Sequence, residues 1–122
     1  MTITKSYKDL IVWQKGVELS VLVYELTEKF PNEERYALTS QMRRAAVSIP
    51  SNIAEGRCRS TKKDFCQFLH IALGSAAELE TQIEIAKRIS KTSNISYTTI
   101  EALLTEVMKM LNALISKLEA NA

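Results

Sequence analysis

The side chains best suited to chemistry are few and widely spaced in this chain. His70, the only histidine, follows Cys66 by about one helical turn, and Cys58 precedes both. Zinc accepts ligands of this kind, but a structural zinc site needs a fourth ligand and a recognisable Cys/His spacing. A di-iron bundle site needs Glu-x-x-His pairs on two helices, which one histidine cannot supply. We therefore expect no metal site and a half-exposed histidine.

Three acidic residues come nearest to a general acid/base pair, namely Glu78, Glu80 and Glu84. Neighbouring turns of a helix hold side chains about 5 to 6 Å apart at best, and Glu80 would point in another direction. The sequence also contains no glycine-rich phosphate loop and no Ser/His/Asp set at a favourable spacing. We expect a protein that is not an enzyme, with no catalytic residue and no cofactor.

Basic residues dominate one stretch of the chain. Residues 35–63 carry seven basic side chains and one acid, Glu55, so their local charge is +6, whereas the whole chain carries +2. A basic zone on a mildly acidic body suits a polyanion or an acidic protein partner. The seven cations are Arg35, Arg43, Arg44, Arg57, Arg59, Lys62 and Lys63.

Six of these cations are the predicted nucleic-acid-binding residues. Arg43 and Arg44 are about 100° apart on a helix, so at least one is exposed or pairs with an acid of another helix. No aromatic residue lies between Arg43 and Lys63, which favours phosphate contact over base stacking. A solvated charge run without a function is the alternative. The other four surround a loop, the usual location of phosphate contacts, and are Arg57, Arg59, Lys62 and Lys63.

Asn52 and Glu55 follow Pro50 closely. A proline inside a helix frees the carbonyl four residues before it, and a freed carbonyl near a core must find a donor. One interpretation is that Asn52 and Glu55 satisfy such backbone groups or bind an adjacent helix. Ligand binding is the other.

The composition indicates one ordinary domain. With 122 residues and 46% hydrophobic content, residues 1–122 are expected to form a single core. No apolar run approaches the roughly 20 residues that a membrane-spanning helix needs, and no secretory signal follows Lys5 and Lys8. We expect a cytoplasmic protein, in which Cys58 and Cys66 stay free thiols.

Hydrophobic periodicity predicts four helices. The first covers about residues 8–29 and ends at Pro31, and the second runs from an Asn32 cap to about 55, kinked but unbroken at Pro50. Many small residues would let another helix approach the second one, and Gly56 is its expected stop. The third opens at 61 and ends before the polar turn 90–94, and the last begins near 96–98. The expected fold is an all-α, antiparallel up-down-up-down four-helix bundle.

The first helix has two apolar faces, which is more than a four-helix bundle covers. Leu10, Trp13, Val17, Val21 and Tyr24 form one face, and we expect it to pack inward. The opposite face would remain in water, so we expect a homo-oligomer, with identical chains closing a ring. The predicted oligomer interface on that second face is Leu19, Leu22, Leu26 and Phe30. The alternative is that the two faces exchange roles, with the first face outside.

The stretch from Leu38 to Gly56, LTSQMRRAAVSIPSNIAEG, closely resembles the hallmark of the four-helix-bundle proteins encoded in intervening sequences of bacterial 23S rRNA genes. The likeness covers nearly the whole chain. Its supporting segments are Asp9-Leu10, residues 12–15, Phe30-Pro31, Phe65 with Phe68-Leu69, Ile71-Ala72, Gly74-Ser75 and residues 78–82.

This family is similar to the accessory variability determinant of diversity-generating retroelements, a basic ring-shaped homopentamer that works beside a reverse transcriptase. The resemblance implies a homopentamer with RNA, another nucleic acid or an RNA-handling protein as its partner. The function that we expect is a non-catalytic oligomeric module whose basic zone binds the phosphates of RNA or another nucleic acid, or binds an RNA-handling protein. The alternative is a protein-protein interaction scaffold with no nucleic-acid role.

Overall fold

The computed structural model describes residues 6–120, whose regular secondary structure consists of helices alone. The all-α class and the four predicted helices are confirmed. Two short 3-10 helices, η1 (Tyr7–Asp9) and η2 (Asn32–Glu34), precede the first and second long helices. The long helices are α1 (Ile11–Thr27), α2 (Leu38–Arg57), α3 (Lys62–Arg88) and α4 (Thr98–Ala120).

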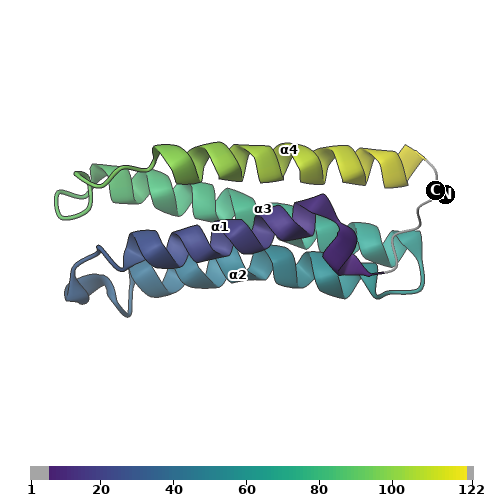
Figure 1. Ribbon diagram of the computed structural model, residues 1–122, viewed down its shortest axis with the longest axis horizontal. Helices are drawn as coiled ribbons and strands as arrows, with labels where there is room; N and C mark the ends of the chain where they lie inside the picture. Colours follow the sequence, from purple (N-terminus) through teal and green to yellow (C-terminus); the bar gives the residue numbers. More distant parts are fainter. Residues whose placement is uncertain (1–5, 121–122) are drawn as a thin grey trace.

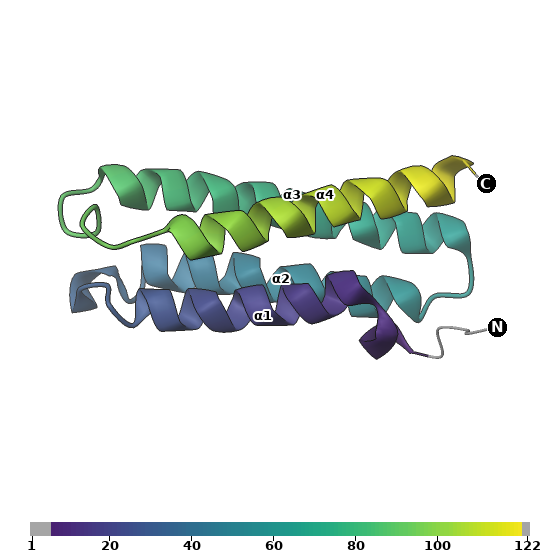
Figure 2. The ribbon, with the colours of Figure 1, turned by 45° about the horizontal axis from the view of Figure 1, so that its top comes forward.

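The four long helices lie side by side along the long axis of the molecule (Figures 1 and 2). α1 lies beside α2 and α4, and α3 lies beside the same two helices, so that within residues 6–120 α1 stands diagonally across from α3 and α2 from α4. The α1–α2 and α3–α4 connections lie at one end, and the α2–α3 connection lies at the other (Figure 1). Each helix must therefore present an apolar face toward a common centre.

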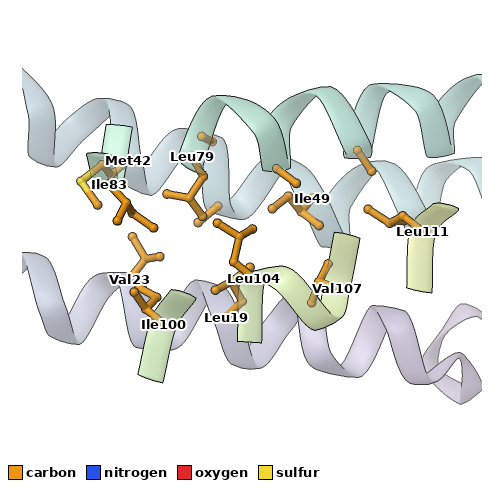
Figure 3. Packing of buried hydrophobic residues seen from close by; sticks show 14 of the residues in the cluster. Leu19, Val23, Met42, Ile49, Leu79, Ile83, Ile100, Leu104, Val107 and Leu111 are labelled. Carbon is orange, nitrogen blue, oxygen red and sulfur yellow. The ribbon is translucent and has the colours of Figure 1, made fainter. Parts of the chain in front are cut away.

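The core fills that centre with leucine, isoleucine and valine from all four helices. Figure 3 shows Leu19 of α1, Leu79 of α3 and Leu104 of α4 pointing toward one another, and each is 2% exposed or less. The stripe predicted for the third helix is confirmed from Leu69 to Ala86, where every member is buried. Met42 and Ile49 of α2 point into the same core (Figure 3).

α1 and α2 approach each other closely where both carry small side chains. Gly16 is buried, and a Cβ atom on it would lie 3.3 Å from the Cβ atom of Pro50. Pro50 lies inside α2, which runs without interruption from Leu38 to Arg57. The prediction that the second helix continues through Pro50 is therefore confirmed.

α2 and α3 share the most extensive contact in the bundle, and Ser48, one of the small residues of α2, meets Ser75 of α3 there at 2.8 Å. Gly56 is not the helix stop that we expected, since α2 includes it and ends at Arg57. Its position reflects packing instead: a Cβ atom on Gly56 would lie 2.6 Å from the Cβ atom of Phe68. No glycine among residues 6–120 has a positive φ angle.

The start of the second helix differs from the prediction. Asn32 begins η2 and caps no α-helix, and α2 starts at Leu38. Its first amide is met by an acidic side chain of the preceding turn, since the Leu38 amide donates to Glu34 Oε1 at 3.4 Å. By contrast, the cap predicted for the third helix is confirmed, because Thr61 Oγ1 accepts from the Asp64 amide at 3.1 Å.

Candidate nucleic-acid interface

The six predicted nucleic-acid-binding residues do not form one zone. Arg43 and Arg44 lie near the end of the bundle that holds the α1–α2 connection, and the other four lie around the α2–α3 connection at the opposite end (Figure 1). The rise of about 1.5 Å per residue separates Arg44 from Arg57 by about 20 Å along α2. Two basic clusters therefore replace the single basic zone that the sequence predicted.

Arg43 is held by α1. Its Nε atom donates to Thr27 Oγ1 at 2.8 Å, one Nη atom lies 3.4 Å from the carbonyl oxygen of Tyr24, and its guanidinium lies 4.5 Å above the Tyr24 ring. A carboxylate just after the same helix, on Glu28, is 3.8 Å away. Several donors of this side chain are therefore engaged within the chain, and its plane has a defined orientation.

The side chains of Arg44 and Arg35 have no such engagement. Both are exposed, and neither side chain makes a hydrogen bond or ion pair with any residue from 6 to 120. They line an open groove of about 720 Å³ together with Arg43, and Glu28 is the one acidic residue on its walls within the described chain. We call this hollow the arginine groove. Its walls come from the end of α1, the connection that contains η2, and the first half of α2.

The second cluster, the basic loop, consists of Arg57, Arg59, Lys62 and Lys63. Arg59 donates to Glu55 Oε2 at 2.7 Å and lies 4.8 Å above the Phe68 ring. Lys62 and Lys63 are exposed in the first turn of α3 and pair with no acid of the described chain. The helix dipole disfavours cations at that end, so their presence does not serve the stability of α3.

Aromatic rings accompany the arginines, although the sequence favoured phosphate contact without stacking. Tyr36 is 90% exposed and Tyr24 is 44% exposed, and both line the arginine groove. Tyr24 belongs to the first helix and Tyr36 precedes Arg43, so neither lies between the six predicted cations in sequence. Tyr36 directly follows Arg35 in the sequence, and this adjacency could have indicated an aromatic residue beside the cations. The arginine groove therefore holds exposed aromatic surface beside its cations, which the sequence spacing did not indicate.

The predicted oligomer interface is wrong. Leu19, Leu26 and Phe30 are buried in the chain's own core, and Leu22 packs against that core. They face inward because α1 lies between α2 and α4, and periodicity alone does not tell which of two apolar faces is the inner one. Gly16 and Ser20, buried against α2, were the signal that could have identified the inner side.

The outer face of α1 is the one that remains uncovered. Val21 is 51% exposed and Val17 is 37% exposed, and both line an apolar hollow of about 330 Å³ with Tyr24 and Val47. We call these four residues the valine seam. The prediction that α1 keeps an exposed apolar face is confirmed, although the face is the other one. The valine seam shares Tyr24 and Val47 with the arginine groove.

The polar residues after Pro50 have structural partners. Asn52 Nδ2 donates to the Ser48 carbonyl at 2.8 Å and lies 2.9 Å from Ser48 Oγ, which is 2.8 Å from Ser75 Oγ of α3. This network ties α2 to α3, in agreement with the structural interpretation of Asn52. Glu55 pairs with Arg59 at the surface, so neither residue meets the carbonyl that the proline frees.

The potential metal ligands make other contacts. His70 Nε2 lies 3.2 Å from Glu119 Oε2. The pKa of the Cys66 thiol is raised, mainly by burial and to a lesser extent by the negative charge of Glu119. Among residues 6–120, no three His, Cys, Asp or Glu side chains gather closely enough to hold a metal ion. Glu84 pairs with Arg88 at 2.9 Å, while Glu78 and Glu80 are exposed.

The family model of the 23S rRNA-intervening sequence protein matches residues 8–113. The chain belongs to this family. It is also similar to a crystal structure of a protein of unknown function from the S23 ribosomal protein family of Bacteroides thetaiotaomicron, with 31% identity and a TM-score of 0.77. That likeness covers 86% of this chain and 98% of the other. No curated protein matches the chain.

The family match spans the elements that build both basic clusters, since residues 8–113 include α1, α2 and α3 in full. The arginine groove and the basic loop are thus parts of the family domain itself. Among the described residues, no helix is both long and apolar enough to cross a membrane.

Proposed function

We propose that this protein is a non-catalytic, self-assembling module that binds RNA mainly through phosphate contacts. The observation that carries the proposal is the arginine groove, a hollow walled by three arginines and one carboxylate. Guanidinium groups bind phosphate oxygens through paired hydrogen bonds. Arg35 and Arg44 have no acidic partner within residues 6–120, so a polyanion can recruit them without breaking an ion pair.

The basic loop offers a second point of attachment. Lys62 and Lys63 are exposed without an acidic partner in the described chain, and lysine ammonium groups attract phosphates irrespective of base sequence. The two clusters lie toward opposite ends of α2, about 20 Å apart along the helix, so one molecule can contact two stretches of a folded RNA. The name of the family, which refers to 23S rRNA, is consistent with an RNA partner.

Self-assembly is the second part of the proposal, and the valine seam is its interface. A monomer that leaves Val17, Val21, Tyr24 and Val47 in water carries an aggregation liability. A second copy of the chain would cover this apolar strip, and a ring of copies would repeat the basic clusters and strengthen a weak contact by avidity. The resemblance to the accessory variability determinant implies five copies. The alternating positions of the three connections (Figure 1) support the antiparallel order of helices that this proposal assumes.

A protein-interaction scaffold without a nucleic-acid role is the alternative function. The valine seam favours it, because an apolar strip bordered by arginines also suits an acidic, partly apolar protein segment. The two functions make different predictions for RNA that carries no protein: an RNA-binding module binds it, and a protein-interaction scaffold does not.

A salt series of RNA binding tests the proposal. The purified protein is titrated against a structured RNA at several salt concentrations, and phosphate contact requires affinity to fall steeply as salt rises. Changing Arg35 and Arg44 to Gln should weaken binding and flatten the salt dependence, by roughly one unit of slope for each phosphate that the variant no longer binds. Changing Arg57, Arg59, Lys62 and Lys63 together to Gln should do the same at the other end.

The matched control removes charge elsewhere. Lys109 and Lys117 are exposed on α4 and, like Arg44, pair with no acid in the described chain, so changing both to Gln should leave the affinity unchanged. No binding at any salt concentration, or equal weakening in the control, would remove the RNA function and leave the scaffold.

Light scattering tests the assembly. The wild-type protein should be an oligomer at micromolar concentration, and Val21→Ser should dissociate it. Ile85→Ser changes a comparably exposed residue of α3, 45% exposed, and should not. A monomeric wild-type protein would overturn the self-assembly and the avidity argument with it.

A further inference from the structure

We infer that the arginine groove binds an unpaired RNA nucleotide, with the base stacked on Tyr36 and the phosphate held by Arg35 and Arg44. The inference rests on the proposed RNA binding and adds the class of RNA, which is a single strand or an open loop rather than a continuous duplex. The two arginines, the ring and the hollow beside them belong to one surface.

Tyr36 has the features of a stacking platform. Its side chain is far more exposed than any other large hydrophobic residue of the described chain. Neither its ring nor its hydroxyl contacts an aromatic partner or hydrogen-bond partner within residues 6–120. Aromatic rings usually gain stability by burial, so a ring left almost wholly in water contributes little to this fold. A flat ligand is the partner that would cover it.

The backbone that carries Tyr36 is well anchored. The Arg35 amide donates to the Asn32 carbonyl at 3.0 Å, and the Ala37 amide donates to the Glu34 carbonyl at 3.1 Å. The Gln41 amide then donates to the Ala37 carbonyl at 3.0 Å. The turn on both sides of Tyr36 is therefore hydrogen-bonded, which reduces the entropy lost when a base settles on the ring.

Arg43, which also lines the groove, is preorganised by contacts with α1. Arg43 is fixed by Thr27 at 2.8 Å and by stacking over Tyr24 at 4.5 Å, so it adds positive charge to the groove without needing to move. The guanidinium groups of Arg44 and Arg35 keep all their donors free of partners in the described chain. An anion entering the groove would therefore meet one fixed guanidinium and two that can close on it.

The chemistry favours an unpaired nucleotide over a duplex. Bases inside an A-form helix are stacked on each other, and the deep, narrow major groove keeps protein side chains away from them. A protruding tyrosine can therefore reach a base face only where the strand is open. Ser40 lines the same hollow, and its hydroxyl has no partner among the described residues, so it is available to a ribose hydroxyl or a base edge.

The test compares two RNA probes by fluorescence anisotropy at fixed salt concentration, a short oligoadenosine and a blunt duplex of equal charge. Adenosine monophosphate is added as a competitor. The wild-type protein should bind the single strand more tightly than the duplex. Tyr36→Ala should weaken single-strand binding by roughly tenfold or more, the cost of one lost base stack, and leave duplex binding and the salt slope unchanged. Tyr36→Phe should retain the wild-type affinity, because it keeps the ring.

A direct contact is detected by photochemical crosslinking. Ultraviolet irradiation of the complex with the oligoadenosine should crosslink the peptide that contains Tyr36, and Arg44→Gln should reduce the yield. Ile71→Ala, a change of a half-exposed residue on α3, is the control and should alter neither the affinity nor the crosslink. Circular dichroism confirms that each variant remains helical.

The outcomes separate the inference from the proposed function. Salt-dependent RNA binding that Tyr36→Ala leaves intact would overturn the inference and keep the RNA function. If adenosine monophosphate competes with an affinity equal to that of the oligoadenosine, the inference is also overturned, because the site would then recognise a free nucleotide. Absence of any RNA binding would remove both.

Discussion

The hydroxyl of Ser20 lies 3.0 Å from the carbonyl oxygen of Ala46, and both groups are buried. Ala46 precedes Pro50 by four residues, so its carbonyl is the one that the proline deprives of a helical donor. The same hydroxyl lies 3.0 Å from the Gly16 carbonyl of its own helix. The single proton of this hydroxyl is shared between the two carbonyl oxygens, so α1 offers a donor to the carbonyl that Pro50 leaves without one.

Removal of this hydroxyl should be costly. Ser20→Ala leaves the Ala46 carbonyl buried without a donor, and we expect a loss of about 1 to 3 kcal/mol in the free energy of unfolding. The change is measured by urea denaturation followed by circular dichroism. Ser116→Ala, at an exposed position of α4, is the control, and its effect should stay within about 0.5 kcal/mol.

A double-mutant cycle shows whether the proline is the cause. Pro50→Ala restores an amide that can donate to Ala46, so Ser20→Ala should cost less in that background than in the wild type. Equal costs in both backgrounds would mean that the hydroxyl does not compensate for Pro50.

Alanine substitutions at two glycines should change stability in opposite directions. Gly56→Ala places a Cβ atom 2.6 Å from the Cβ atom of Phe68, and we expect overpacking to destabilise the bundle by about 1 to 3 kcal/mol. Gly74 is exposed inside α3, and a Cβ atom on it would meet no described atom within 4 Å. Gly74→Ala should therefore stabilise the protein by about 0.5 to 1 kcal/mol. Thermal unfolding of the two variants beside the wild type provides the comparison.

The two faces of α1 should respond differently to truncation. Leu19 is fully buried, and Leu19→Ala should lower the free energy of unfolding by about 2 to 5 kcal/mol. Val21 is half exposed in the single chain, and Val21→Ala should change the unfolding free energy of the separated chain by no more than about 0.5 kcal/mol. Denaturation at several protein concentrations distinguishes the fold of one chain from its assembly, and comparable costs would contradict the assignment of the faces.

The two thiols should differ in reactivity. Cys58 is exposed, whereas Cys66 is half-buried and burial raises the pKa of its thiol. A raised pKa keeps the thiol protonated over a wider range of pH, and alkylation needs the thiolate. Cys58 should therefore react with iodoacetamide faster than Cys66 at neutral pH. The difference between the two alkylation rates should become smaller as the pH rises. Peptide mapping by mass spectrometry detects each site, with Cys58→Ser as the control for assignment.

The helical class and the apolar stripes could be predicted without any knowledge of how the helices pack. Residues 69–86 repeat an apolar side chain at helical spacing, and this periodicity is a local property that needs no partner to be recognised. The cap at Thr61 and the continuity of α2 through Pro50 were predictable for the same reason. The segment from Leu38 to Gly56 likewise indicated the family, which the match over residues 8–113 shows.

The inner face of α1 and the contact of Tyr24 with Arg43, by contrast, depend on the packing of one helix against another. Leu19 and Val21 are both apolar, and the packing of α1 between α2 and α4 is what buries one and exposes the other. The same packing brings Tyr24 of α1 beside Arg43 of α2. The distance of about 20 Å between Arg44 and Arg57, on the other hand, follows from the rise of the single helix α2 and could have been predicted from the sequence. The burial of Leu19 and the contact of Tyr24 with Arg43 join residues of different helices, so the apolar spacing within one helix does not determine them.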